Sequence, residues 1–178
     1  GKSALVAAAL ADLPPDRVAR HRASPGARDR AYEGLAYLVP DAVAHGAVDR
    51  SALVHDAVDH LAASDLDTIW VDDVPHLDEP SMVVLFHAAE RGAIRLVLTA
   101  RSGLRLPTAV EAIAADGRLD LAEVAPFDEA DIEVLLTAVL GGHVARPTIR
   151  RFTRRSGGNP LLLRELVRST LATGSLDD

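Results

Sequence analysis

The stretch TIWVDD at residues 68–73 decides the fold, because a short apolar run is closed there by two acidic residues. A continuous apolar run of this length is typical of a strand buried on both faces of a parallel sheet. The run AIRLVLT at residues 93–99 has the same character and predicts a second buried strand. Helical patterns separate such runs, and strands that alternate with helices predict an α/β fold with a parallel sheet.

Working outward, the other elements follow from apolar spacing and from capping residues. Two further strands are predicted at residues 17–24 and 118–124, where apolar and polar residues alternate. Asp128 and Asp131 resemble a capping box at the start of a helix, and SGGNP at residues 156–160 predicts a helix end followed by a helix start. The predicted helices cover residues 4–13, 32–38, 49–63, 80–91, 108–115 and 128–140, with two more between 147 and 172 and a loop over the rest of 25–47.

Length and composition exclude several classes of protein. The 178 residues, 48% of them apolar, suffice for a globular core and exclude a wholly disordered chain. Cysteine is absent, which excludes disulfides and thiolate metal sites and is compatible with the cytoplasm. A net charge of −7 and only 3% aromatic residues argue against nucleic-acid binding by this segment. No apolar run reaches the roughly 18 residues of a membrane span, so we expect a cytoplasmic protein that does not contact the membrane.

The first residues, Gly1, Lys2 and Ser3, match the end of the phosphate-binding loop G-x-x-x-x-G-K-[ST]. An alanine-rich helical run follows directly, as such a loop requires, because a helix N-terminus presents backbone N–H groups to phosphate. Lys2 would then contact the β- and γ-phosphates, and the Ser3 hydroxyl would bind Mg²⁺. A tripeptide also matches by chance, so this interpretation depends on the other motifs. We expect the rest of the loop and the strand before it to lie upstream, which makes the chain a piece of a longer protein.

Polar residues follow both buried strands where these end. Ligands bind at the carboxyl ends of parallel strands in open α/β sheets, so Asp72 and Asp73 are candidate ligand-binding residues. Asp72 is predicted to bind Mg²⁺, which prefers oxygen ligands, and Asp73 to orient or deprotonate an attacking water. Thr99 and Arg101 lie at the end of the next strand, where an arginine can contact a γ-phosphate. The alternatives are a solvated surface turn for the two acids and a solvated strand-end arginine.

Other chemically suggestive residues have simpler interpretations. His55 and His60 are too poorly spaced to share a helical face, which argues against a metal site. His76 follows the two acids and is interpreted as a loop histidine, with a catalytic base near the site as the alternative. The arginines within residues 150–155 are explained by solvation and by the dipole of their helix, with phosphate sensing by one of them as the alternative.

Taken in order, the motifs GKS (1–3), VDDVPHLDEPS (71–81), LTAR (98–101) and SGGNPLLLREL (156–166) resemble the ATPase module of STAND-class signal-transduction NTPases. Within that class the chain is similar to large LuxR-family bacterial transcriptional regulators, which belong to the AAA-type P-loop superfamily. The similarity covers nearly the whole chain. It implies a three-layer core with strand order 5-1-4-3-2 at residues 1–126, lacking the strand before the P-loop, and a small helical lid at 127–178.

The resemblance also implies ligands and residue roles. ATP or ADP and Mg²⁺ would bind between core and lid, and ATP would promote self-association. DNA binding would belong to regions outside this chain. By this resemblance, Gly1, Lys2 and Ser3 would bind the phosphates, and Ser3 would also bind Mg²⁺. Asp72 and Asp73 would form the Walker B pair. Arg101 would be the sensor, and Pro160 would lie beside the adenine.

These features together predict an ATP-binding and ATP-hydrolysing switch in a bacterial regulator of transcription. Slow hydrolysis would reset the arrangement of core and lid, and hydrolysis would be impaired without the beginning of the loop. One alternative is a catalytically inactive P-loop-fold scaffold for protein partners. Another is an AAA-type remodelling ATPase, which would need an arginine donated by a neighbouring subunit.

Overall fold

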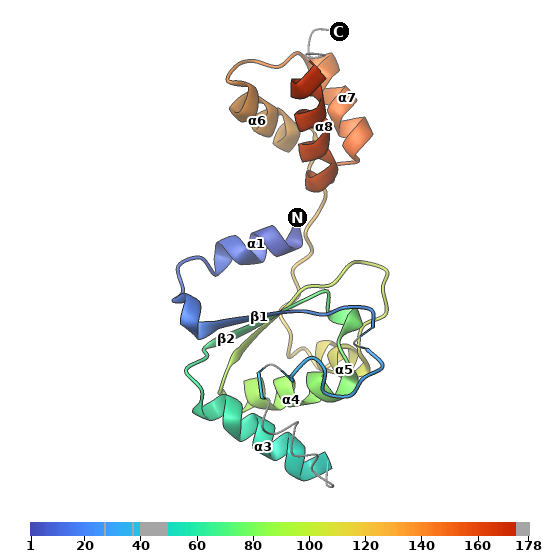
Figure 1. Cartoon of the computed structure of the whole chain (residues 1–178). Coiled ribbons are helices and arrows are strands. Elements are labelled where there is room, and N and C mark those ends of the chain that lie inside the picture. Colours follow the sequence, from blue (N-terminus) through green and yellow to red (C-terminus); the bar gives the residue numbers. More distant parts are fainter. Residues whose placement is uncertain (27, 37, 40–49, 174–178) are drawn as a thin grey trace. The chain divides into compact units, whose positions relative to one another are not determined.

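The chain divides into two units in the computed structural model, which describes residues 1–26, 28–36, 38–39 and 50–173 (Figure 1). An α/β unit comprises Ser3–Leu121, and a helical unit comprises Ala122–Asp178 together with Gly1–Lys2. The sequence pattern puts the boundary after residue 126, whereas the packing puts it after Leu121.

Three parallel strands form the sheet of the α/β unit: β1 (Val18–Arg22), β2 (Thr68–Asp72) and β3 (Arg95–Leu98), in the order β1-β2-β3. Every residue of β2 is buried, which confirms the strand predicted from TIWVDD. In β3, by contrast, Arg95 is exposed and the other residues are only half-buried, so the prediction of a second fully buried strand is wrong. The reason is that β3 has one strand neighbour among the described residues, which leaves its other edge uncovered.

Three helices pack with the sheet, and the middle one, α4, contacts the other two (Figure 1). They are α3 (Arg50–Ala63), α4 (Glu79–Glu90) and α5 (Thr108–Ala115). Their apolar side chains form one core with β2, in which Leu61, Val71, Leu85 and Val110 are buried. This core places β2 in the interior of the unit.

The remaining helical segments of the α/β unit are short. Two 3₁₀ turns, η1 (Pro15–Arg17) and η2 (Val74–His76), precede β1 and follow β2. Helix α1 (Lys2–Ala9) buries none of its side chains, although most of them are apolar. None of the helices in the described part of the chain combines the length and the apolar character needed to cross a membrane.

Asp78 fixes the start of α4 and ties a distant loop to it. Its Oδ1 accepts hydrogen bonds from the backbone N–H groups of Tyr32 at 2.9 Å and Ser81 at 2.8 Å. Its Oδ2 accepts from the N–H of Gly34 at 3.1 Å and from the Ser81 hydroxyl at 2.7 Å. These four bonds compensate the burial of a carboxylate that is 1% exposed.

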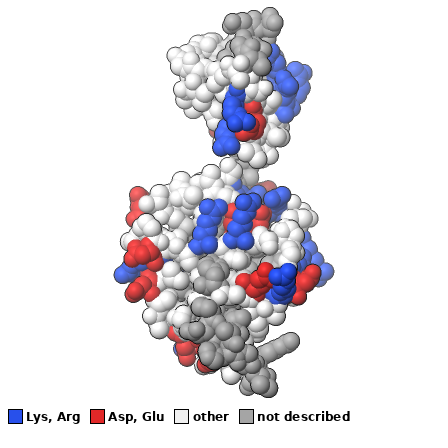
Figure 2. Space-filling model, in the orientation of Figure 1, with Lys and Arg blue, Asp and Glu red and all other residues white. Residues whose placement is uncertain are grey.

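Three helices form the helical unit: α6 (Glu129–Leu140), α7 (Arg146–Ser156) and α8 (Pro160–Thr173). Helix α7 contacts both of the others, and its Ile149 and Phe152 join them in a separate apolar core. The exposed side of α7 is rich in arginine and has no acidic residue. Figure 2 shows basic side chains gathered over this helix, whereas both signs of charge occur on the visible face of the α/β unit.

The predicted ends of helices in this unit are confirmed. The Asp128 carboxylate accepts from the Asp131 N–H at 2.8 Å and the Asp131 carboxylate accepts from the Asp128 N–H at 3.2 Å, which is a capping box. Gly157 ends α7 in the left-handed conformation. A Cβ on Gly158 would lie 2.3 Å from the carbonyl oxygen of Phe127, so the turn requires glycine there.

Two predicted elements are not found in the described part of the chain. Residues 118–124 form no strand and are largely exposed, with Leu121 79% exposed. Alternation produces a strand pattern, but a strand also needs a hydrogen-bonded neighbour, and the described residues offer none there. Residues 32–36 and 38 form turns rather than a helix, and Tyr32 has a φ of 63°, which helical geometry does not allow. Residue 37 of the predicted helix lies outside the described residues, and so do residues 27 and 40–47 of the predicted loop.

Candidate functional site

The carboxylate of Asp72 is the centre of the candidate site. Asp72 is the last residue of β2 and is 5% exposed. Its Oδ1 accepts hydrogen bonds from the hydroxyls of Ser3 at 2.9 Å and Thr99 at 2.6 Å. Its Oδ2 accepts from the Arg20 guanidinium at 3.2 Å. Segments that are far apart in the sequence therefore meet at the carboxyl end of the central strand.

These contacts decide the charge of Asp72. Burial acts to raise its pKa, but the hydrogen bonds from Thr99, Ser3 and Arg20, together with the positive charge of Arg20, outweigh burial and hold the pKa below its ordinary value. Asp72 is therefore an anion at neutral pH and can act as an oxygen ligand.

Asp73 and Arg101 meet beside Asp72. Arg101 donates from Nε to one carboxylate oxygen of Asp73 at 3.2 Å and from Nη2 to the other at 3.3 Å. Asp73 has φ 61° and ψ 48°, in the left-handed region that residues with a side chain rarely occupy. The next N–H, that of Val74, donates to the Thr99 carbonyl at 2.9 Å and so holds this backbone in place. Strain of this kind clusters at functional sites.

The GKS tripeptide lies at the start of α1. Ser3 is in the first turn of that helix and reaches Asp72 with its hydroxyl. Gly1 and Lys2 group with the helical unit, and in the chain they stand directly before Ser3. The structure thus joins Ser3 to Asp72, while the phosphate contacts of Gly1 and Lys2 stay predictions.

Arg20 is a member of the site that the sequence did not reveal. It lies on β1 in register with Trp70 of β2, and its Cζ atom is 4.0 Å from the centroid of the Trp70 ring. The guanidinium is therefore held between this ring and the Asp72 carboxylate. Alternation in VARHR indicates a strand, but the neighbour of Arg20 depends on strand register, which no local pattern contains.

The oxygens of Ser3 and Asp72 fit a Mg²⁺ ion by their chemistry, because a hydroxyl and a carboxylate are both hard ligands. They supply two protein ligands, so the other positions around the ion would belong to phosphate oxygens and water. In the part of the chain that the structure describes, no group of three or more His, Asp or Glu side chains is arranged to hold a metal. The site therefore suits a metal that arrives with a phosphate ligand.

Pro160 lies in the helical unit, at the first position of α8. The Asn159 side chain accepts a hydrogen bond from the Leu161 N–H at 2.9 Å and so caps the helix that Pro160 begins. Capping accounts for this turn, and the contact of Pro160 with an adenine stays a prediction.

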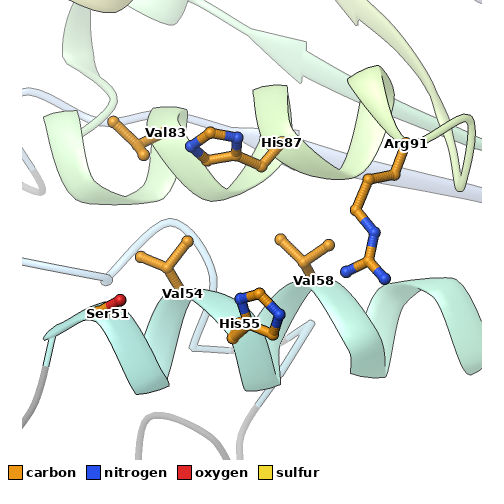
Figure 3. Close-up of a pocket in the computed structure, with 7 residues that line it drawn as sticks. All are labelled: Ser51, Val54, His55, Val58, Val83, His87 and Arg91. Atoms are coloured by element: carbon orange, nitrogen blue, oxygen red, sulfur yellow. The ribbon is translucent and has the colours of Figure 1, made fainter.

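A separate pocket of about 370 Å³ lies between α3 and α4 (Figure 3). It is lined by Ser51, Val54, His55, Val58, Val83, His87 and Arg91. Arg91 pairs with Asp59 at 2.7 Å and His87 with Glu90 at 3.3 Å, so both of these basic groups already have acidic partners. None of the predicted site residues lines this pocket.

Comparison of the sequence with models of known protein families gives no match, and comparison with curated protein sequences gives none either. The candidate site therefore depends on the contacts described above and on the resemblance of its motifs.

Proposed function

We propose that the chain is the ATP- and Mg²⁺-binding switch module of an AAA-type P-loop protein. The observation that carries this proposal is the meeting of Ser3, the two acids Asp72 and Asp73, and Arg101 at one end of the sheet. These residues belong to three separate motifs of the sequence, and their convergence is what a single phosphate-bearing ligand needs. The three neighbouring strands β1, β2 and β3 also agree with the run 4-3-2 within the strand order that the resemblance implies.

In this proposal each residue has a defined role. Lys2 contacts the phosphates, and Ser3 and Asp72 hold Mg²⁺, which neutralises phosphate charge. Arg101 leaves Asp73 and contacts the γ-phosphate instead. Asp73 is then free to accept a hydrogen bond from the attacking water and to orient it.

We further propose that the intact protein is a cytoplasmic, signal-responsive regulator of transcription in a bacterium. This second proposal depends on the similarity of the motifs to LuxR-family regulators. DNA binding is assigned to regions outside this chain, in line with the net charge of −7. For the nucleotide to act as a switch, it must bind two arrangements of the protein with different affinity.

The test measures Mg²⁺-dependent binding of a fluorescent ATP analogue to the protein extended by the residues encoded upstream of Gly1, where the first glycine of the loop is expected. We expect Asp72→Asn and Lys2→Ala each to weaken binding by about tenfold or more, because each removes a charged contact. Asp67→Asn is the matched control, because Asp67 is exposed, precedes β2 and pairs with Arg17 at 3.1 Å. Equal affinity in all three variants would refute the proposal.

The ion pair of Asp73 with Arg101 favours a second candidate, a module that binds nucleotide without hydrolysing it and serves as a scaffold for protein partners. Both carboxylate oxygens of Asp73 accept hydrogen bonds from Arg101, so an attacking water would have to compete with Arg101 for this carboxylate. Measured ATP turnover distinguishes the two. Loss of turnover in Asp73→Asn supports the switch, and equally low turnover in Asp73→Asn and the natural sequence supports the scaffold.

A further inference from the structure

Arg20 holds an unusual place among the partners of Asp72. Its guanidinium lies 4.0 Å from the centre of the Trp70 ring and 3.2 Å from the Asp72 Oδ2. Trp70 is 3% exposed, whereas the Arg20 side chain is 51% exposed. The ring and the carboxylate are fixed in the core, so the arginine is the partner that can leave.

The partners of Asp72 differ in how they respond to a second cation. The hydroxyls of Ser3 and Thr99 can rotate and offer a lone pair to a metal ion, since a hydroxyl is both donor and acceptor. The guanidinium of Arg20 is a cation that has only donors and no acceptor. Arg20 is therefore the partner that opposes a cation at Asp72.

We propose that Arg20 is a resident counter-cation that competes with a divalent cation for Asp72, and that cation binding releases Arg20 from the Trp70 ring. This inference rests on the proposed function, because it takes Asp72 as a cation ligand. It gives Arg20 a positioning role: in the absence of ligand it holds the Asp72 carboxylate in place and weakens binding of free metal. A metal that arrives together with phosphate brings anionic oxygens that Arg20 can contact instead.

The first experiment measures binding of Mn²⁺ alone to the 178-residue chain by electron paramagnetic resonance. Arg20→Met keeps a long apolar side chain over the ring but removes the charge, and we expect Mn²⁺ to bind roughly tenfold more tightly as a result. Arg20→Lys keeps the positive charge but not the planar guanidinium that stacks on Trp70, so Mn²⁺ should bind to it more weakly than to Arg20→Met. Arg17→Met is the matched control, because Arg17 pairs with exposed Asp67 and does not contact Asp72.

The sign of the change separates this role from a merely structural one. If Arg20 only supported the fold of the site, its removal would loosen the ligands and Mn²⁺ would bind equally or more weakly. Equal or weaker binding in Arg20→Met, or no Mn²⁺ binding in either protein, would overturn the inference.

The second experiment uses the fluorescence of Trp70, which is the sole tryptophan of the sequence. Titration with Mg²⁺ should change the emission of the natural sequence as the guanidinium leaves the ring. The change should be absent in Asp72→Asn and reduced severalfold in Arg20→Met. A constant emission while Mn²⁺ binds through Asp72 would overturn the release of Arg20 and leave the proposed function intact. Unchanged Mn²⁺ affinity in Asp72→Asn would overturn both.

Discussion

Two buried aspartates of the α/β unit, Asp72 and Asp78, differ in the groups that donate hydrogen bonds to them. Asp78 accepts from the backbone of a loop that is distant in sequence, and from both the N–H and the hydroxyl of Ser81 at the start of its own helix. Asp72 accepts from two hydroxyls and one guanidinium, all of them side-chain groups that can turn away. The difference indicates that Asp78 is a structural carboxylate, whereas Asp72 can exchange its partners for a ligand.

The largest expected effect is on stability at Asp78. Asp78→Ala leaves buried backbone N–H groups without acceptors, and we expect a loss of about 3 kcal/mol or more in the free energy of unfolding. Asp72→Ala frees groups that can rotate or reach water, so its loss should be about 1 kcal/mol. Urea unfolding of both variants measures the difference, and equal losses would contradict the distinction between the two carboxylates.

Removing the serine hydroxyl that donates to each carboxylate should change the free energy of unfolding in the same order, with the larger loss at Asp78. Ser81 is fully buried, and Ser81→Ala removes one of the four hydrogen bonds to Asp78, at a cost of about 1 kcal/mol. Ser3 is half-buried on a helix that has no fully buried side chain, so Ser3→Ala should change the free energy of unfolding by only about 0.5 kcal/mol or less. Thermal unfolding followed by circular dichroism measures the stability of both variants. A larger loss of stability in Ser3→Ala than in Ser81→Ala would reverse the comparison.

The backbone conformation of Asp73, the residue after Asp72, can be tested in a third measurement. Asp73 holds a left-handed conformation, in which alanine is strained by about 1 kcal/mol and glycine is not. Both substitutions remove the contact with Arg101, so their difference isolates the backbone. We expect Asp73→Gly to be about 1 kcal/mol more stable than Asp73→Ala in urea unfolding, and equal stability would mean that the conformation is not retained.

The smallest expected effect is on the stability of the protein at acidic pH. Because the folded pKa of Asp72 is lowered, the unfolded chain takes up its proton first as the pH falls. The stabilisation by the ionised carboxylate is therefore complete above the ordinary value of about 3.9 and is lost as the pH falls through the folded pKa. The difference in unfolding free energy between the natural sequence and Asp72→Asn should shrink below about pH 4. A difference that stays constant as the solution is acidified from neutral through this range would show that Asp72 is not anchored by these contacts.

Local signals predicted the regions of the fold that depend on neighbours in sequence. The apolar run ending at Asp72 identified the buried central strand, and the spacing of Asp128 and Asp131 identified a capping box. The position of two acids at the end of the apolar run also placed Asp72 and Asp73 at the end of the sheet where Ser3 and Arg101 meet them.

Long-range pairing decided the regions that the sequence did not predict. Residues 118–124 alternate as a strand does, but the described residues provide no strand to pair with them. Arg20 became a member of the site through its register with Trp70, which depends on how two strands far apart in the chain align. Asp78 was equally hidden, because its donors Tyr32 and Gly34 lie in a distant loop.

Helix α1 has a consequence for how the site assembles. It buries none of its side chains, and in the described part of the chain the bond from Ser3 to Asp72 is the hydrogen bond that fastens it to the sheet. Its amides should accordingly exchange with deuterium through fraying, long before the strands open. A ligand bound by the Ser3 hydroxyl would also have to keep α1 helical, so the cost of ordering this helix would lower its affinity. Slower deuterium exchange along α1 would therefore indicate that the site is occupied.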